Sequence, residues 1–325
     1  GVHKIATKPA IIQKPTGLRQ IPAQITDCSM FSYRHAFHAG NHADVLKHTT
    51  LIAIAQYLVQ KDTPLSVIDT HAGAGLYRLD GDFAQTSGEA MEGIARMLSA
   101  DPATLAPALQ TYLAMVQSFN PGAHLRTYPG SPALLLQVLR PQDKLRLFEL
   151  MPQDARALLG NAEQLLEGRQ AQVLMEDGFA NAKKFLPPPD RRGLLLCDPS
   201  YEMKTDYAKV ATFIDDSLRR FATGCYAVWY PIIGRQEAHD LPKRLKSLAA
   251  KAGKNWLHAT LTVKSGKLQT LADGSVKRPG LPASGMCIIN PPFTLHAALE
   301  AALPQMVALM GQDKNAGFTL ESTGR

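Results

Sequence analysis

An apolar run that begins at Gly193 ends at a carboxylate, which is followed by a proline, a small polar residue and an aromatic ring, in the order "GLLLCDPSY". The Asp198 carboxylate and the Pro199 carbonyl can accept hydrogen bonds from one planar amine, and they would stabilise charge that develops on its nitrogen. Tyr201 can stack on the ring that carries this amine. These residue types in this order could therefore hold a planar amine that is attached to an aromatic ring.

The same pattern resembles the motif of amino-group methyltransferases that use S-adenosylmethionine, in which Asp, Asn or Ser precedes two prolines and Tyr or Phe. A second stretch, "IINPPF", matches this motif more closely, with Asn290 in the first position. It follows the last predicted strand, however, whereas open parallel sheets bind ligands near the first and fourth strands, where the strand order reverses. We therefore expect the site at Asp198 and not at Asn290.

The turn after another predicted strand could approach a ligand closely. In "VIDTHAGAGLY", Asp69 ends the strand and Gly73 and Gly75 occupy the turn, where the absence of side chains leaves backbone N–H groups accessible. A dinucleotide-binding loop would need a third glycine, but this chain has Arg78 at that position and His71 inside the turn. On its own, the stretch is equally compatible with a ligand loop and with an ordinary tight turn.

Two further strand ends carry acidic residues. Glu149 ends the second predicted strand, and Asp177 with Gly178 follows the third. A carboxylate can accept both hydroxyls of a ribose, and a carboxylate beside a backbone amide can pair with the edge of an adenine. Because the carboxyl ends of parallel strands lie at one edge of the sheet, we expect these residues and Asp198 to face a common ligand.

Short apolar runs that alternate with amphipathic stretches predict the elements that position these residues. Such alternation is typical of an α/β fold with a mostly parallel sheet. The predicted strands are 65–69, 144–149, 171–176, 193–198, 225–230, 256–263 and 284–290. A basic, glycine-rich connection joins the last two and is typical of a long hairpin. We therefore expect a mostly parallel seven-stranded sheet whose last strand is antiparallel.

The spacing of these strands also predicts the domain organisation. About 75 residues separate the first two strands, far more than one crossover needs, and we interpret residues 78–128 as a small helical insertion. Residues 1–29 contain three prolines and no apolar periodicity, so we expect a disordered tail or an expression remnant rather than a transit peptide. The main domain is predicted over 30–310, and a tail over 311–325.

Four of the ten histidines lie within 14 residues near the start of this domain. They are His35, His38, His42 and His48. No cysteine or glutamate lies at ligand spacing, so we expect no metal, and one or two of these histidines could pack in the core. The alternative is a polar segment that closes over cofactor and nucleic acid. In it, Lys47 and His48 lie on the first helix, and Tyr33, Arg34 and His35 reach the substrate.

The overall charge favours an anionic partner. The chain of 325 residues has a net charge of +7, and residues 1–29 contribute +3 through four basic residues and one acid, so residues 30–325 carry +4. This excess is compatible with nucleic acid but does not define a patch. The four cysteines form no CxxC pair, so we expect free thiols and a cytoplasmic protein. No apolar run is long enough for a membrane helix.

From Met30 to about residue 310, the chain is similar to the bacterial 23S ribosomal RNA adenine-N6 methyltransferases of the J type. The resemblance extends over "SYRHAFHAGNHADVLKHT", "DTHAGAG", "EGIAR", "YPGSP", "RRGLLLCDPSYEMKTDY", "RFATGCYAVWYP" and "ASGMCIINPP". It implies a Rossmann-like class I methyltransferase fold with a small helical insertion. It also implies S-adenosylmethionine as the cofactor, S-adenosylhomocysteine as its product, and one adenine of 23S ribosomal RNA as the substrate.

Several site residues follow from this resemblance, position by position. With Lys47 and Gly73 from the patterns above, the expected cofactor contacts are His48, His71, Ser131, Glu149, Asp177, Gly178 and Asp198. Asp198 is also expected to be catalytic, and Tyr33 to contact the RNA. Ser131 begins "SPALLLQV", where a serine cap and a proline in the first turn predict a helix. The family motif reads DPPY, and Ser200 replaces its second proline, which removes a constraint on the loop.

Three other functions are compatible with parts of the pattern. A DNA adenine methyltransferase would use the same DPSY chemistry, whereas the missing third glycine disfavours a nicotinamide-dependent oxidoreductase. A non-catalytic RNA-binding module would explain the charge but not the acids at the strand ends. For the favoured function we expect a monomer that acts on free or early-assembly 23S ribosomal RNA, with no membrane partner.

Overall fold

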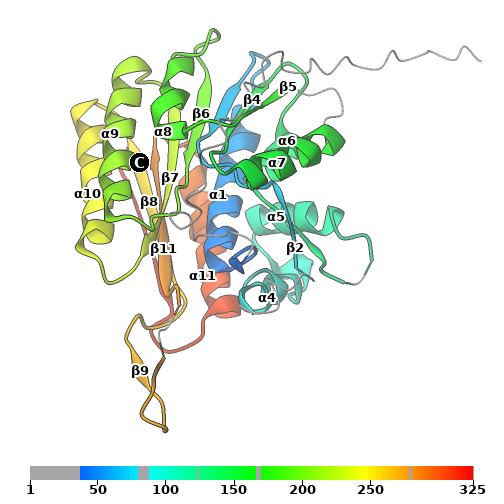
Figure 1. Cartoon of the computed structure of the whole chain (residues 1–325), viewed down its shortest axis with the longest axis vertical. Coiled ribbons are helices and arrows are strands. Elements are labelled where there is room, and N and C mark those ends of the chain that lie inside the picture. Colours follow the sequence, from blue (N-terminus) through cyan, green and yellow to red (C-terminus); the bar gives the residue numbers. More distant parts are fainter. Residues whose placement is uncertain (1–36, 80–87, 123, 166–169, 278–279, 325) are drawn as a thin grey trace, which may run out of the picture. The chain divides into compact units, whose positions relative to one another are not determined.

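The computed structural model describes residues 37–79, 88–122, 124–165, 170–277 and 280–324, so the tail expected at 1–29 lies outside the described residues. One eight-stranded sheet organises the described part, in the order β12-β8-β11-β7-β6-β1-β4-β5 (Figure 1). Its strands are β1 (Ser66–Asp69), β4 (Lys144–Phe148), β5 (Gln170–Leu174), β6 (Gly193–Cys197), β7 (Cys225–Ile232), β8 (Trp256–Thr262), β11 (Ala283–Ile289) and β12 (Gly317–Ser322).

The strand directions agree with the sequence pattern. β5, β4, β1, β6 and β7 pair in parallel, whereas β11 pairs antiparallel with both β7 and β8. β8 therefore runs in the same direction as β7. The connection between β8 and β11 contains the short antiparallel pair of β9 (Gln269–Thr270) and β10 (Val276–Lys277). The mostly parallel sheet with an antiparallel last core strand is thus confirmed.

The predicted number of seven strands is one too few. Residues 311–325, which the sequence predicts as a tail, contain β12, and this strand pairs antiparallel with β8 at the edge of the sheet. The Thr319 and Thr260 hydroxyls lie 2.6 Å apart across the pair, and Lys246 Nζ donates to Glu321 Oε2 at 2.6 Å. An edge strand of this kind is only partly buried, so its sequence lacks the apolar run that reveals a central strand.

The helical insertion lies between β2 (Leu76–Arg78) and β3 (Thr127–Pro129). These two strands pair antiparallel, with Arg78 opposite Thr127, so the inserted segment leaves and re-enters the domain at neighbouring points. Its helical elements are α3 (Glu89–Glu92), α4 (Ile94–Leu98), the 3-10 turn η3 (Pro102–Thr104) and α5 (Pro107–Ser118). α5 packs against α1 (His42–Leu58) and α11 (Leu295–Met310), so the insertion extends the core of the domain.

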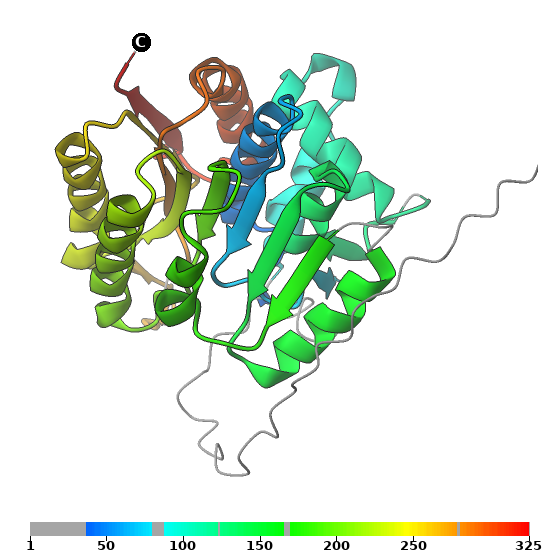
Figure 2. The same ribbon diagram turned by 90° about the horizontal axis from the view of Figure 1, so that it is seen from above.

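Helices cover both faces of the sheet. α1 (His42–Leu58) and α11 (Leu295–Met310) lie on one face, and α9 (Lys204–Arg220) and α10 (Gln236–Lys251) lie on the other (Figure 2). The described residues also contain the helices α6 (Ser131–Val138), α7 (Pro152–Leu165) and α8 (Gly178–Asn181). In the part of the chain that the structure describes, no helix is long and apolar enough to cross a membrane.

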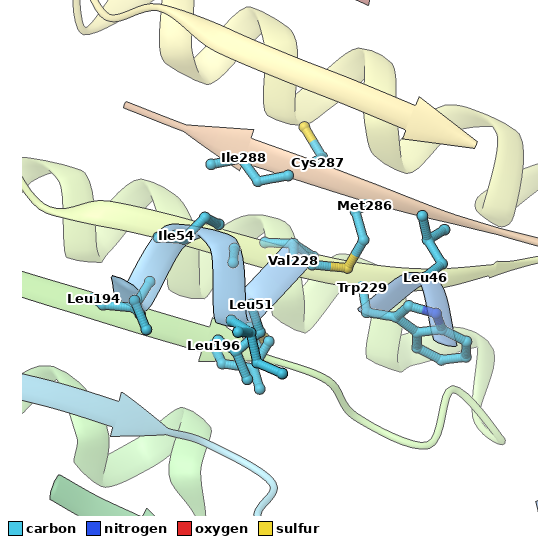
Figure 3. Close-up of a cluster of buried hydrophobic side chains, with 14 of the residues drawn as sticks. Leu46, Leu51, Ile54, Leu194, Leu196, Val228, Trp229, Met286, Cys287 and Ile288 are labelled. Carbon is cyan, nitrogen blue, oxygen red and sulfur yellow. The ribbon is translucent and has the colours of Figure 1, made fainter. Parts of the chain in front are cut away.

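α1 is buried on several sides because it lies between the sheet and the insertion. It packs against β7 and β11 on one side and against α5, α6 and α11 on others. Figure 3 shows its contact with three strands, formed by Leu46, Leu51, Ile54, Leu194, Leu196, Val228 and Met286. Since most of this helix is removed from water, its polar side chains must find partners inside the protein.

Candidate active site

Asp198, directly after β6, forms an ion pair with Lys47 of α1. Lys47 Nζ lies 2.5 Å from Asp198 Oδ2 and 2.9 Å from Asp44 Oδ1, and the three side chains are at most 13% exposed. Burial alone lowers the pKa of Lys47, but the two carboxylates outweigh it and raise this pKa above its ordinary value. The lysine therefore stays charged and ties the loop after β6 to α1.

The start of α1 orients Asp44. Gly40 donates its N–H to Asp44 Oδ2 at 2.9 Å, and the Asp44 N–H donates to Asn41 Oδ1 at 3.0 Å, which caps the helix. Gly40 has a φ of 77°, in the left-handed region that favours glycine. Sequence reasoning misses Asp44, although its three-residue spacing from Lys47 places both on one face of a helix.

The strand register aligns the acids of this edge. Leu196 of β6 and Leu147 of β4 both pair with Asp69 of β1. Asp198 lies two residues after Leu196, and Glu149 lies two residues after Leu147. The two acids therefore occupy equivalent positions after β6 and β4, on either side of β1 and Asp69. The structure thus brings together at the carboxyl edge the acids that the sequence predicts there.

The loop after β1 is bound to Glu149. Gly73 has a φ of 64°, and its N–H donates to Glu149 Oε2 at 2.8 Å, while the Met151 N–H donates to Oε1 at 2.7 Å. Burial raises the pKa of Glu149, although these hydrogen bonds oppose the shift. A Cβ at Gly73 would lie 2.2 Å from Tyr77 Oη, so glycine is required for this close approach.

Ser131 contacts Asp69 and does not cap its helix. The N-cap of α6 is Gly130, and Ser131 Oγ donates to Asp69 Oδ2 at 2.6 Å. The serine cap predicted from the sequence is therefore wrong, because the hydroxyl binds a fully buried carboxylate instead. Burial raises the pKa of Asp69 to about 7, against which the Ser131 hydrogen bond acts.

Asp177, Gly178 and His71 lie together beyond β5 and β1. Asp177 Oδ1 accepts the Phe179 N–H at 2.8 Å and so caps α8. Gly178 packs so closely against the residue after β1 that a Cβ there would lie 2.1 Å from the Thr70 carbonyl oxygen. The rings of His71 and Phe179 meet edge to face, with centroids 4.7 Å apart. Burial lowers the pKa of His71 to about 4, so its imidazole is neutral near pH 7.

Tyr201 does not form the exposed stacking surface that the motif predicts. Its side chain is 2% exposed, and its hydroxyl donates to the Trp229 carbonyl at 2.6 Å. Its φ is 55°, a strained value for a residue other than glycine, and Arg235 donates to its carbonyl at 3.2 Å. Packing against Tyr207 and Trp229 keeps the ring inside. In this conformation Tyr201 fixes the shape of the loop and offers no face to a base.

His48 links α1 to β3. Its Nδ1 lies 2.7 Å from the Tyr128 hydroxyl, which in turn lies 2.8 Å from the Tyr112 hydroxyl. The His48 side chain is buried in this network, with 1% of the residue exposed. This environment is the core packing that the sequence left open for one or two histidines, and the cofactor contact of His48 stays a prediction.

Of the other predicted residues near the start of the domain, His38 and His42 are described by the structure and three are not. His38 Nδ1 lies 2.7 Å from Glu89 Oε2, and His42 Nε2 donates to the Leu281 carbonyl at 3.0 Å. These histidines bind different elements, and among the described residues no group of three potential ligands is placed to hold a metal ion. The three predicted RNA contacts all lie outside the described residues. They are Tyr33, Arg34 and His35.

The competing motif at Asn290 lies at the opposite edge of the sheet. Because β11 is antiparallel, its last residue, Ile289, pairs with Tyr226 at the start of β7. Asn290 Nδ2 donates to the carbonyls of Ala222 and Gly224, at 2.8 and 2.7 Å, in the turn before β7. Asn290 therefore stabilises the amino edge, away from the acids described above.

Sequence reasoning also misses two apolar residues beside the predicted site. Leu150, directly after Glu149, is 47% exposed, which is unusual for a leucine at the end of a central strand. The ring of Trp229 lies 5.5 Å from Lys47 Nζ, close enough for a cation–π contact. Trp229 lies inside an apolar strand run, so its sequence context indicates only core packing.

These features define a class of protein. The order β5-β4-β1-β6-β7-β11-β8, with β11 reversed, combines with a glycine loop after β1 and an acid after β4. This is the Rossmann-like class I methyltransferase fold, in which ligands bind at the carboxyl edge where the strand order reverses.

Comparison with known proteins identifies the family. The family model described as "Ribosomal RNA large subunit methyltransferase D, RlmJ" matches residues 62–322. Ribosomal RNA large subunit methyltransferase J of Escherichia coli K12 is 44% identical over 275 residues, which cover 85% of this chain and 92% of that protein. The protein of the same name from Haemophilus influenzae is 39% identical over 293 residues, with coverage of 90% and 98%. The chain belongs to this methyltransferase family.

A solved structure of similar sequence supports the fold assignment. The crystal structure of protein LPL1258 from Legionella pneumophila is 31% identical in sequence and has a TM-score of 0.76. The match covers 88% of this chain and 98% of the Legionella protein. The helical insertion and the edge strand β12 both lie within the residues that the family model matches.

Buried Asp69 predicts a pH dependence of stability. Its pKa is about 7 in the folded protein and 3.8 ordinarily, so between these values the folded state holds a proton that the unfolded chain has released. The free energy of unfolding therefore falls as pH rises through this window. Asp69→Asn carries no ionisable group and should avoid this loss. Relative to the parent, we expect its free energy of unfolding to rise by roughly 2–3 kcal/mol between about pH 5 and pH 7.5.

Urea unfolding at the two pH values measures this change. Asp190→Asn, on the exposed turn before β6, is the matched control and should follow the parent at both values. An equal difference between Asp69→Asn and the parent at both pH values would contradict the prediction.

Proposed function

We propose that this protein uses S-adenosylmethionine to methylate the exocyclic N6 amine of one adenine in 23S ribosomal RNA, adenine 2030 in the family. One observation carries the proposal: Asp198 and Pro199 lie at the carboxyl end of β6, beside β1 and its Gly73 loop, with Asp198 paired to Lys47. Membership of a family named for ribosomal RNA methyltransferases supports RNA as the substrate class.

The residues after β1, β4 and β5 fit the chemistry of S-adenosylmethionine. The Glu149 carboxylate is held by two backbone N–H groups, and its oxygens can accept further hydrogen bonds from ribose hydroxyls. Exposed Leu150 offers an apolar surface to a purine ring, and Asp177 with Gly178 would bind the purine edge. Gly73 allows the backbone to approach closely. When bound, the cofactor supplies an electrophilic methyl group.

The target amine needs two hydrogen-bond acceptors. Its lone pair is delocalised into the base, so the nitrogen is a poor nucleophile, and positive charge develops on it during transfer. The Asp198 carboxylate and the Pro199 carbonyl supply the acceptors and stabilise this charge. Lys47 binds Asp198 through Oδ2, and a carboxylate has further lone pairs for an amine. Because the site is largely buried, these interactions act in a low effective dielectric.

Tyr201 contributes through the shape of the loop. Its buried ring and its hydrogen bond to Trp229 hold the strained backbone after Pro199, and this strain is of the kind that active-site loops store. We propose that the loop thereby orients the Pro199 carbonyl. The stacking surface for the base then has to come from another aromatic group.

On the RNA side, the contact of Tyr33 rests on the family resemblance, and the contacts of Arg34 and His35 rest on the polar, partly basic segment that contains them. We propose that Tyr33, Arg34 and His35 contact the substrate, and that His48, His71 and Ser131 line the cofactor side. We further propose that a monomeric enzyme acts on free or early-assembly 23S RNA.

Transfer of a labelled methyl group to 23S RNA tests the proposed function. We expect Asp198→Ala to lower the single-turnover rate by at least about 100-fold, since it removes the side-chain acceptor that holds the amine and stabilises its developing charge. Asp190→Ala, at the other end of β6, should leave the rate unchanged. Intact ribosomal subunits and duplex DNA are tested in parallel. Full activity of Asp198→Ala, or transfer to DNA alone, would contradict the proposal.

Ser200→Pro restores the proline of the family motif. Ser200 is exposed, and a proline there would restrict the loop that carries Pro199. We expect the single-turnover rate to rise by up to about fivefold, which corresponds to roughly 1 kcal/mol, with cofactor affinity unchanged. A rate equal to that of the parent would show that the serine is neutral and that this prediction is wrong.

A further inference from the structure

The connection between β8 and β11 projects from the same edge as Asp198. We call residues 264–277 the arm. Thr262 of β8 and Ile232 of β7 both pair with Ala283, so the arm begins where the parallel strands end. Figure 1 shows β9 extending beyond this edge, at the end of the sheet where α4 of the insertion also lies.

The arm has a defined tip. Val276 pairs with Thr270, and the Leu271 N–H donates to the Ser275 carbonyl at 2.8 Å. Asp273 Oδ1 accepts from the N–H and the hydroxyl of Ser275, at 2.9 and 2.6 Å. These bonds close a tight hairpin, so the arm presents its side chains from a structured element.

The base of the arm is fixed to the body of the domain. The Val263 N–H donates to the Pro282 carbonyl at 2.9 Å, and the Ser265 N–H donates to Asp313 Oδ2 at 2.8 Å. On the other side, His42 Nε2 donates to the Leu281 carbonyl, and His42 is the first residue of α1, the helix that carries Lys47. The direction of the arm is therefore coupled to the helix that binds Asp198.

The arm combines positive charge with exposed apolar side chains. Its charged residues are Lys264, Lys267, Asp273 and Lys277, a net +2 in 14 residues, which is half of the +4 carried by residues 30–325. Leu268, Leu271 and Val276 are 64%, 43% and 58% exposed. The fold does not require these apolar residues, because they contribute nothing to the core, and such exposure indicates a binding surface.

We propose that the arm binds the RNA that flanks the target adenine. This inference rests on the proposed function, because it is the adenine at Asp198 that brings flanking RNA to this edge. Lys264 and Lys267 would neutralise backbone phosphates, and the apolar side chains would contact riboses and base edges. The concentration of positive charge in the arm favours RNA over a protein partner.

Paired charge removals test the proposal. Lys264→Ala/Lys267→Ala removes two positive charges from the arm. Lys251→Ala/Lys254→Ala removes two at the opposite edge, from the last residue of α10 and from the turn before β8. For the arm variant we expect a KM for 23S RNA transcript about tenfold higher with kcat unchanged. Its plot of log KM against log salt should be shallower by about 2. The control variant should match the parent in all three.

A second variant separates the apolar contribution. Leu268→Ser/Val276→Ser should weaken binding of radiolabelled 23S transcript in a filter assay without changing the salt slope, and urea unfolding should match the parent. Equal transcript affinity and salt slope for the parent and both arm variants would overturn the proposal. The proposal would also be overturned if Leu268→Ser/Val276→Ser kept its RNA affinity but lost self-association of the protein, measured by sedimentation.

The filter assay keeps this inference separate from the proposed function. If the parent transferred no methyl group to any RNA, the proposed function would fail. Arm-dependent transcript binding would in that case still support the arm as an RNA-binding element, and arm-independent binding would overturn it.

Discussion

One ammonium group held between two carboxylates is the constraint on which the rest of this site depends. Lys47 lies within 3 Å of both Asp44 and Asp198, and all three side chains are largely buried. A buried charge without a partner costs several kcal/mol, so α1 and the loop after β6 cannot move apart without a large penalty. The three groups together carry a net charge of −1, which suits the proposed reaction, in which positive charge develops on an amine.

The direction of the strands decides which of two similar motifs can serve the proposed chemistry. DPSY follows a strand that runs with β1, and NPPF follows one that runs against β7. Both contain a residue in the left-handed region, Tyr201 in one and Asn290 in the other, so their local backbones share a feature. Their surroundings differ, because Asn290 binds the turn before β7 whereas Asp198 meets Lys47. A motif therefore acquires its role from the edge of the sheet that it reaches.

Much of the fold could be predicted from the sequence, because central strands are continuous apolar runs that end at polar residues. All seven predicted strands are present within two residues of their expected ends. β12 could not be predicted in this way, since an edge strand needs few buried side chains. The clustering of Asp69, Glu149 and Asp198 was likewise predictable, because parallel strands place their carboxyl ends at one edge.

The partners of these side chains could not be predicted, because they come from distant parts of the chain. Asp198 binds Lys47 from 151 residues away, and His48 meets Tyr128 across 80 residues. Ser131 has the sequence of a helix cap but donates to Asp69 instead. The motif suggests a stacking role for Tyr201, yet its hydroxyl finds a carbonyl inside the core. Local patterns thus indicate which residues matter, and tertiary contacts determine what each of them does.

Hydrogen–deuterium exchange with and without S-adenosylmethionine tests most directly whether the carboxyl edge is the active edge. A site after β1, β4 and β5 predicts slower amide exchange in residues 71–75, 149–151 and 178–180 when the cofactor is added, with residues 290–294 unchanged. Protection confined to 290–294, with the loop at Gly73 unaffected, would place the cofactor at the opposite edge and contradict the role assigned to Asp198.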